Sequence, residues 1–156
     1  MGDFIQNYGG DLLAILGATI AFVLAGIGST KGVYMAGEAG AGVLTEEPGR
    51  FGAVMVLQAL PSTQAIYGFV IAFLTLQKVT GTPLPVVDGL SLFIASLPVG
   101  IIGLVSGVLQ GKVATAGIHM VAKRADGMVR GIILALMVEM FAIIGFIISI
   151  LMLGKV

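Results

Sequence analysis

Four long stretches of almost uninterrupted apolar residues constrain this 156-residue chain more than any other feature. Charged or turn-forming residues separate them, and they run from about Asp11 to Leu44, Phe51 to Gln77, Leu90 to Ala122 and Met128 to Leu153. Each exceeds the roughly 20 residues that a helix needs to cross the hydrocarbon core of a bilayer. Because backbone groups find no water there, each stretch is predicted to be a transmembrane helix. The alternation typical of an outer-membrane barrel is missing.

The composition supports a membrane protein. Hydrophobic residues make up 58% of the chain and charged residues only 10%, whereas soluble domains carry about a quarter charged residues. The formal net charge is zero, which gives nucleic-acid binding no electrostatic support. Cysteine is absent, so disulfides and thiolate metal sites are excluded. The segment before the first stretch is acidic, unlike a secretory signal. We expect a single membrane domain over residues 1–156 that keeps this first span.

The chain reads as two copies of one helical hairpin, at about residues 10–79 and 88–154. "GFVIAFL" in the first half matches "GFIISIL" in the second with an offset of 77, and "GIGSTK" matches "GVLQGK" with an offset of 81. The first and third stretches are rich in glycine, with Gly103, Gly107 and Gly111 at a spacing of four. Small residues at this period let membrane helices approach closely. Packing within one four-helix bundle would explain them, but their density favours a layer shared by many copies in a ring.

The basic residues predict the orientation of the chain. Most lie at or near the end where the first and third connections fall, and these are Lys31, Arg50, Lys112, Lys123, Arg124 and Arg130. Lys78 and Lys155 lie at the other end. The positive-inside rule therefore places both hairpin loops in the cytoplasm and both termini outside.

Glu139 is the residue that most clearly predicts a function. It is the only charged residue between Arg130 and Lys155 and falls near the centre of the fourth stretch. A charge at that depth costs a few kcal/mol or more unless it is paired. Thr63, Gln64 and Gln110 lie, like Glu139, roughly 18–21 Å from the cytoplasmic end at 1.5 Å per residue. A protonated glutamic acid with one interhelical hydrogen bond is the simpler alternative, but it does not explain this shared level.

The second stretch carries a polar face that begins "LPSTQAIYGF". Leu60, Thr63, Gln64 and Tyr67 are spaced i, i+3, i+4 and i+7, which places them on one side of a helix. Pro61 lacks an N–H and crowds the preceding turn, so it is expected to bend the backbone and free a carbonyl oxygen.

These residues predict a site for a monovalent cation. They offer one carboxylate, two amide oxygens, one hydroxyl and one carbonyl, which are hard oxygen ligands with a single negative charge. A divalent cation usually takes more carboxylates, and a proton needs only Glu139. A dehydrated sodium ion fits, with Tyr67 donating its hydroxyl to Glu139. At the offset of 77 the counterpart of Glu139 is Ser62, so one ion is expected per four helices.

"LPSTQAIYGF", "SGVLQGKVATAG" and "MVEMFAIIGF" resemble the ring proteolipid, the K or c subunit, of V/A-type rotary ATPases, and its sodium-specific bacterial members in particular. The resemblance covers nearly the whole chain. It implies an all-α fold of four transmembrane helices in two duplicated hairpins. It also implies sodium ligands at the Leu60 backbone carbonyl, Thr63, Gln64, Gln110 and Glu139, with Tyr67 as the hydrogen-bonding partner of the carboxylate.

The resemblance further implies a multi-copy ring in a bacterial plasma membrane. This ring would turn against a stator subunit that carries an arginine, and a central-stalk subunit would contact the cytoplasmic loops. ATP hydrolysis or synthesis would belong to other subunits, so the chain alone would not be an enzyme and would need no organic cofactor. "GIGSTKG" lacks the spacing of a phosphate-binding loop. Membrane lipid is an expected partner.

Three alternatives remain: a proton-translocating ring, a small secondary transporter with an essential membrane glutamate, and a structural channel-like proteolipid. The roles of two pairs of repeat equivalents are also open. Lys31 and Lys112 suit lipid headgroups or an interface, and Glu38 and His119 suit solvent or a central stalk.

Overall fold

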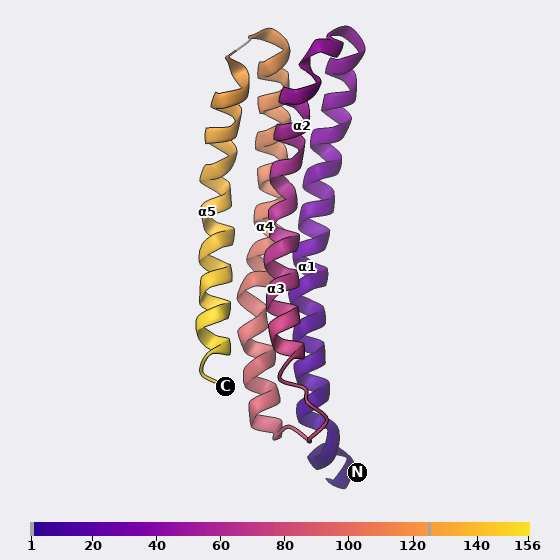
Figure 1. The fold of residues 1–156 in the computed structure, drawn as a ribbon, viewed down its shortest axis with the longest axis vertical. Coiled ribbons are helices and arrows are strands. Elements are labelled where there is room, and N and C mark those ends of the chain that lie inside the picture. Colours follow the sequence, from indigo (N-terminus) through magenta and orange to yellow (C-terminus); the bar gives the residue numbers. More distant parts are fainter. Residues whose placement is uncertain (1, 125) are drawn as a thin grey trace.

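A computed structural model describes residues 2–124 and 126–156, and all regular structure in those ranges is helical. The helices are α1 (Gly2–Glu46), α2 (Phe51–Ala59), α3 (Thr63–Leu76), α4 (Val86–Lys123) and α5 (Gly127–Leu153), with short 3-10 helices at Pro48–Arg50 and Leu60–Ser62. The α1–α2 and α4–α5 connections lie at one end of the molecule, and both termini lie at the other (Figure 1). Ala125, in the second of these connections, is outside the described residues.

Four helical segments are long and apolar enough to cross a membrane, at Gln6–Glu46, Pro48–Leu76, Val86–Lys123 and Gly127–Leu153. The sequence-based prediction of an all-helical, four-span membrane protein is confirmed. The first helix is longer than its apolar stretch, because it starts at Gly2 and not near Asp11. Its early turns are held by the connection after α3, where the Leu84 N–H donates to Asp11 Oδ1 at 3.2 Å. Gly10 packs directly against the backbone of Leu84.

Glycine brings α1 and α4 into backbone contact along the middle of the molecule. Gly28 packs against Gly103 and Gly107, and Gly32 packs against Gly107 and Gly111. A Cβ atom on Gly107 would lie 2.6 Å from the carbonyl carbon of Gly28, so a side chain there would force the helices apart. Intramolecular packing therefore accounts for the regular glycine spacing on α4.

The second and fourth spans pack against this α1–α4 pair (Figure 1). One buried apolar cluster lies toward the termini and includes Ala21, Ile71 and Val99. Another lies toward the hairpin loops and includes Leu57 and Ile118. Along the helices, the segments between the two clusters carry buried polar side chains. The apolar clusters therefore flank a polar level in the middle of the bundle.

Candidate functional site

Three long polar side chains from three different helices are buried together at this level. Gln64 on α3 and Gln110 on α4 are 0% exposed, and Glu139 on α5 is 5% exposed. Buried polar groups are costly in an apolar medium unless they are hydrogen-bonded. The contacts of these three residues therefore define the site.

Pro61 interrupts the second span next to the site. The helix tightens to a 3-10 turn at Leu60–Ser62, and α3 begins at Thr63. The Leu60 carbonyl accepts the backbone N–H of Thr63 and also lies 3.1 Å from Thr63 Oγ1. The N–H of Ala65, in the first turn of α3, donates to Ser29 Oγ on α1 at 2.9 Å. The 3-10 turn agrees with the expected change in the backbone at Pro61, but the Leu60 carbonyl is not free, because it accepts the Thr63 N–H.

Both carboxylate oxygens of Glu139 have partners on α3. The Tyr67 hydroxyl donates to Oε1 at 2.6 Å. Thr63 Oγ1 donates to Oε2 at 2.8 Å, and Gln64 Nε2 approaches the same oxygen at 3.5 Å. Hydrogen bonds to charged groups are shorter and stronger than neutral ones. The residues of the polar face on α3 thus converge on one carboxylate.

The two glutamines contact each other beside the carboxylate. Gln64 Nε2 donates to Gln110 Oε1 at 2.6 Å, and Gln110 Nε2 donates to the Ala135 carbonyl at 3.3 Å. Ala135 precedes Glu139 by one turn of α5. Gln110 therefore joins α3 and α5 through its two ends and fixes the distance between them at the level of the site.

The arrangement concentrates oxygen atoms around a single negative charge. The Gln64 Oε1 atom lies 3.4 Å from Thr63 Oγ1, so a hydroxyl, an amide oxygen and the carboxylate of Glu139 are neighbours. A set made of hard oxygen ligands suits a hard cation. The structure brings together all seven predicted site residues, with Leu60 contributing its carbonyl at the edge and Pro61 next to it in the 3-10 turn.

Sequence reasoning missed three groups that support the site. Ser29 accepts the amide N–H of Ala65, the Ala135 carbonyl accepts from Gln110, and the ring of Phe146 stacks on Tyr67. For two of these groups the sequence contained a clue. Ser29 is the counterpart of Gln110 at the offset of 81, and Phe146 lies seven residues beyond Glu139 on the same side of its helix.

The four residues with open roles lie outside this site. Lys31, Lys112, Glu38 and His119 are all exposed. Glu38 and His119 line a groove of about 510 Å³ between α1 and α4 toward the hairpin-loop end. Gln110 is buried while Lys112 is exposed, so the two side chains point in different directions, as their spacing predicts.

Comparison with known proteins agrees with these features. The family model for the C subunit of ATP synthase matches twice, at residues 16–75 and 93–152, one match in each hairpin. The V-type sodium ATPase subunit K of Enterococcus hirae is 49% identical over 97% of both chains. The A-type ATP synthase subunit K of Methanocaldococcus jannaschii is 38% identical over 91% of this chain and 62% of its own. The 16 kDa proteolipid of the sheep V-type proton ATPase is 26% identical over 91% of both.

The two family matches confirm the duplicated hairpin, and the full-length relatives confirm the predicted resemblance. The chain therefore belongs to the family of ATP synthase C subunits, as a two-hairpin proteolipid of the K type found in V/A-type ATPases.

Proposed function

We propose that this protein is the rotor-ring subunit that carries sodium ions across the membrane in a V/A-type ATPase. The observation that carries the proposal is the burial of Glu139 among Thr63, Gln64 and Gln110. The full-length relative at 49% identity is named as a sodium ATPase subunit. The chain is a non-catalytic part of that complex, because ATP hydrolysis or synthesis takes place on other subunits.

The Gln64 amide supports a cation at this position. Its nitrogen lies between Gln110 Oε1 and Glu139 Oε2, where a cation would contact both oxygens. A rotation of the amide by half a turn would place its oxygen where its nitrogen now lies. The amide oxygen could then be a ligand of the cation. The ion would then be held by Gln64, Gln110, Glu139, the Thr63 hydroxyl and the Leu60 carbonyl.

A bound monovalent ion would also resolve the electrostatic cost of Glu139. One cation beside one carboxylate gives a neutral pair, which crosses a hydrocarbon layer far more easily than a lone charge. Tyr67 covers the carboxylate oxygen that the other ligands leave free. A stator arginine that approached the site would compete for the carboxylate and release the ion.

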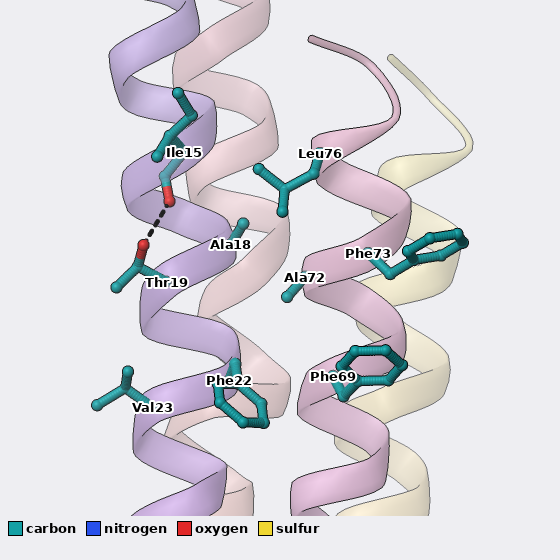
Figure 2. A pocket seen from close by; sticks show the side chains of 9 residues that line it. All are labelled: Ile15, Ala18, Thr19, Phe22, Val23, Phe69, Ala72, Phe73 and Leu76. Carbon is teal, nitrogen blue, oxygen red and sulfur yellow. Dashed lines mark hydrogen bonds between the residues drawn. The ribbon is translucent and has the colours of Figure 1, made fainter.

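An apolar groove on the first hairpin supports assembly with identical copies. Phe22 on α1 and Phe69 and Phe73 on α3 are among its lining residues, and Figure 2 shows the Phe22 ring in the space between the two helices. The groove has a volume of about 440 Å³ and lies between two helices that each cross the membrane.

In the second hairpin most of the repeat-equivalent surface is buried within the bundle, although Ile150, the counterpart of Phe73, is exposed. The offsets of 81 and 77 relate Ile15, Thr19 and Phe22 to Ser96, Gly100 and Gly103, and Ala72 and Leu76 to Ser149 and Leu153. All five of these second-hairpin residues are buried. Gly100 and Gly103 contact Ala21 and Ala25 of α1. By repetition, the groove on the first hairpin would receive the second hairpin of a neighbouring copy.

Repetition of this contact is head to tail and closes into a ring when the rotation allows. The contact between copies would lack an ion site, since Ser62 stands at the position of Glu139 and Phe141 at that of Gln64. Each chain would thus carry one ion. With the hairpin loops in the cytoplasm, the central stalk would contact the end that carries Glu38 and His119.

The decisive experiment is sodium-22 binding to the purified oligomer. Wild type is expected to bind one ion per chain, and Glu139→Gln is expected to bind none, because the amide carries no charge to balance the ion. Glu38→Gln, an exposed carboxylate near the loop end, is the matched control and is expected to bind like wild type. Equal binding by Glu139→Gln and wild type would refute the site.

A proton-translocating ring is the second candidate, because one relative at 26% identity is named as a proton ATPase subunit. Carbodiimides react with a protonated buried carboxyl, so sodium should protect Glu139 from labelling at moderately alkaline pH. Labelling that is independent of sodium concentration would favour the proton.

A further inference from the structure

The aromatic ring of Tyr67 is stacked on the ring of Phe146. The two ring centres are 5.1 Å apart and the ring planes differ by 26°. Phe146 is on α5, seven residues beyond Glu139, so both face α3. Tyr67, which donates to Glu139, therefore also packs against Phe146 on the helix that carries Glu139.

The stack controls where the Tyr67 hydroxyl can be. This hydroxyl is at the far end of a side chain with two rotatable bonds, so a small rotation of the ring would break its 2.6 Å bond to Glu139. Tyr67 and Phe146 both pack on the apolar cluster that lies toward the termini. A swing of the Tyr67 ring away from the carboxylate would therefore also disturb its stacking on Phe146.

The internal repeat shows that the stack belongs to the ion site and not to the general packing of the hairpins. The counterparts of Tyr67 and Phe146 are Ile144 and Phe69. Phe69 is 56% exposed in the apolar groove and Ile144 is 55% exposed. Tyr67 and Phe146 thus meet where the two hairpins of one chain pack around Glu139. Their counterparts Ile144 and Phe69 provide neither a hydroxyl nor a pair of rings.

We propose that Phe146 is a positioning residue that sets the rate at which the site opens. It acts through Tyr67, whose ring it holds in the position that closes the site over Glu139. Loss of the stack would weaken the closed position and let the ion leave faster. This inference rests on the proposed sodium function.

The test measures the release of sodium-22 from the loaded oligomer after dilution into unlabelled sodium. Phe146→Leu keeps apolar volume but removes the ring, and is expected to release sodium about two- to tenfold faster, which corresponds to the loss of one stacked aromatic pair. Phe146→Tyr keeps the ring and is expected to release at the wild-type rate. Phe51→Leu makes the same change at an exposed position near the loop end and is the control.

A double-variant cycle separates positioning from ordinary packing. In a Tyr67→Phe background, which lacks the hydroxyl, Phe146→Leu should have little further effect on release, because both changes remove one interaction. If the fold-changes in release rate of the two single variants multiply in the double variant, the proposal is wrong. A wild-type release rate in Phe146→Leu would also overturn it. Phe146→Met provides a second aliphatic variant should Phe146→Leu not assemble. If the wild-type oligomer bound no sodium, the proposed function itself would fail, and this inference with it.

Discussion

The side-chain nitrogen of Gln64 lies 2.6 Å from the side-chain oxygen of Gln110, although the two residues are 46 positions apart. Gln64 comes from the first hairpin and Gln110 from the second. Together with the bond from Gln110 to the Ala135 carbonyl, this contact spans the site from α3 to α5. The site is therefore a joint product of the two hairpins.

Gln110→Ala should weaken sodium binding without abolishing assembly. The change removes one proposed ligand oxygen. A polar contact with a charged group contributes about 1.5–3 kcal/mol, so we expect affinity roughly ten- to a hundredfold lower. Sodium-22 titration of the oligomer measures this, with Gln77→Ala at the exposed end of the second span as the control. An unchanged affinity would exclude Gln110 from the site.

Tyr67→Phe should bind sodium more weakly and release it faster than wild type. The hydroxyl donates to a carboxylate oxygen that has no other hydrogen-bond partner among the described residues. Hydrogen bonds to charged groups contribute about 1.5–3 kcal/mol, so a loss of roughly tenfold or more is expected. Equilibrium binding measures the effect, and Tyr8→Phe, near the amino-terminal end of α1, serves as control. Wild-type affinity in Tyr67→Phe would show that the hydroxyl does not close the site.

Gly107→Ala should lower the stability of the single chain. Its new methyl group would lie 2.6 Å from the Gly28 carbonyl carbon and 2.8 Å from the Ser29 amide nitrogen, so α1 and α4 would have to separate. Overpacking of this kind typically costs about 1–3 kcal/mol. Thermal unfolding in detergent measures it. Gly42→Ala, where no other atom lies within 4 Å, is the matched control. Equal stability of the two variants would show that close α1–α4 packing is not required.

A cysteine pair should detect the proposed contact between copies. Tyr67 and Phe146 are in contact within one chain, and their repeat counterparts are Ile144 and Phe69. If the same contact forms between chains, Phe69 of one copy lies opposite Ile144 of the next. The natural chain has no cysteine, so Phe69→Cys with Ile144→Cys should give a ladder of disulfide-linked oligomers on oxidation. Each single variant should give dimers at most, and Phe69→Cys with Val129→Cys should give no ladder. The absence of a ladder from the first pair would argue against head-to-tail assembly.

The level of the site could be predicted because depth in a membrane helix follows from counting residues. Glu139, Gln110, Thr63 and Gln64 share a distance from the loops, and the structure brings them into contact. The support around them could not be predicted in this way. Ser29 accepts the Ala65 N–H only because α1 and α3 pack side by side at this level. The Ala135 carbonyl accepts Gln110 only because two helices lie in one register.

Four membrane-spanning helices in two related hairpins could be predicted from the sequence alone, because long apolar stretches and an internal repeat are visible in a linear chain. The sequence also predicted which polar residues share one level of the bundle. Three contacts became visible only in the folded molecule: the glycines of α1 and α4 meet within one chain, Tyr67 stacks on Phe146, and two glutamines bond across the hairpins. These are contacts between helices far apart in sequence, and they depend on the rotation and axial shift of each helix, which side-chain packing sets.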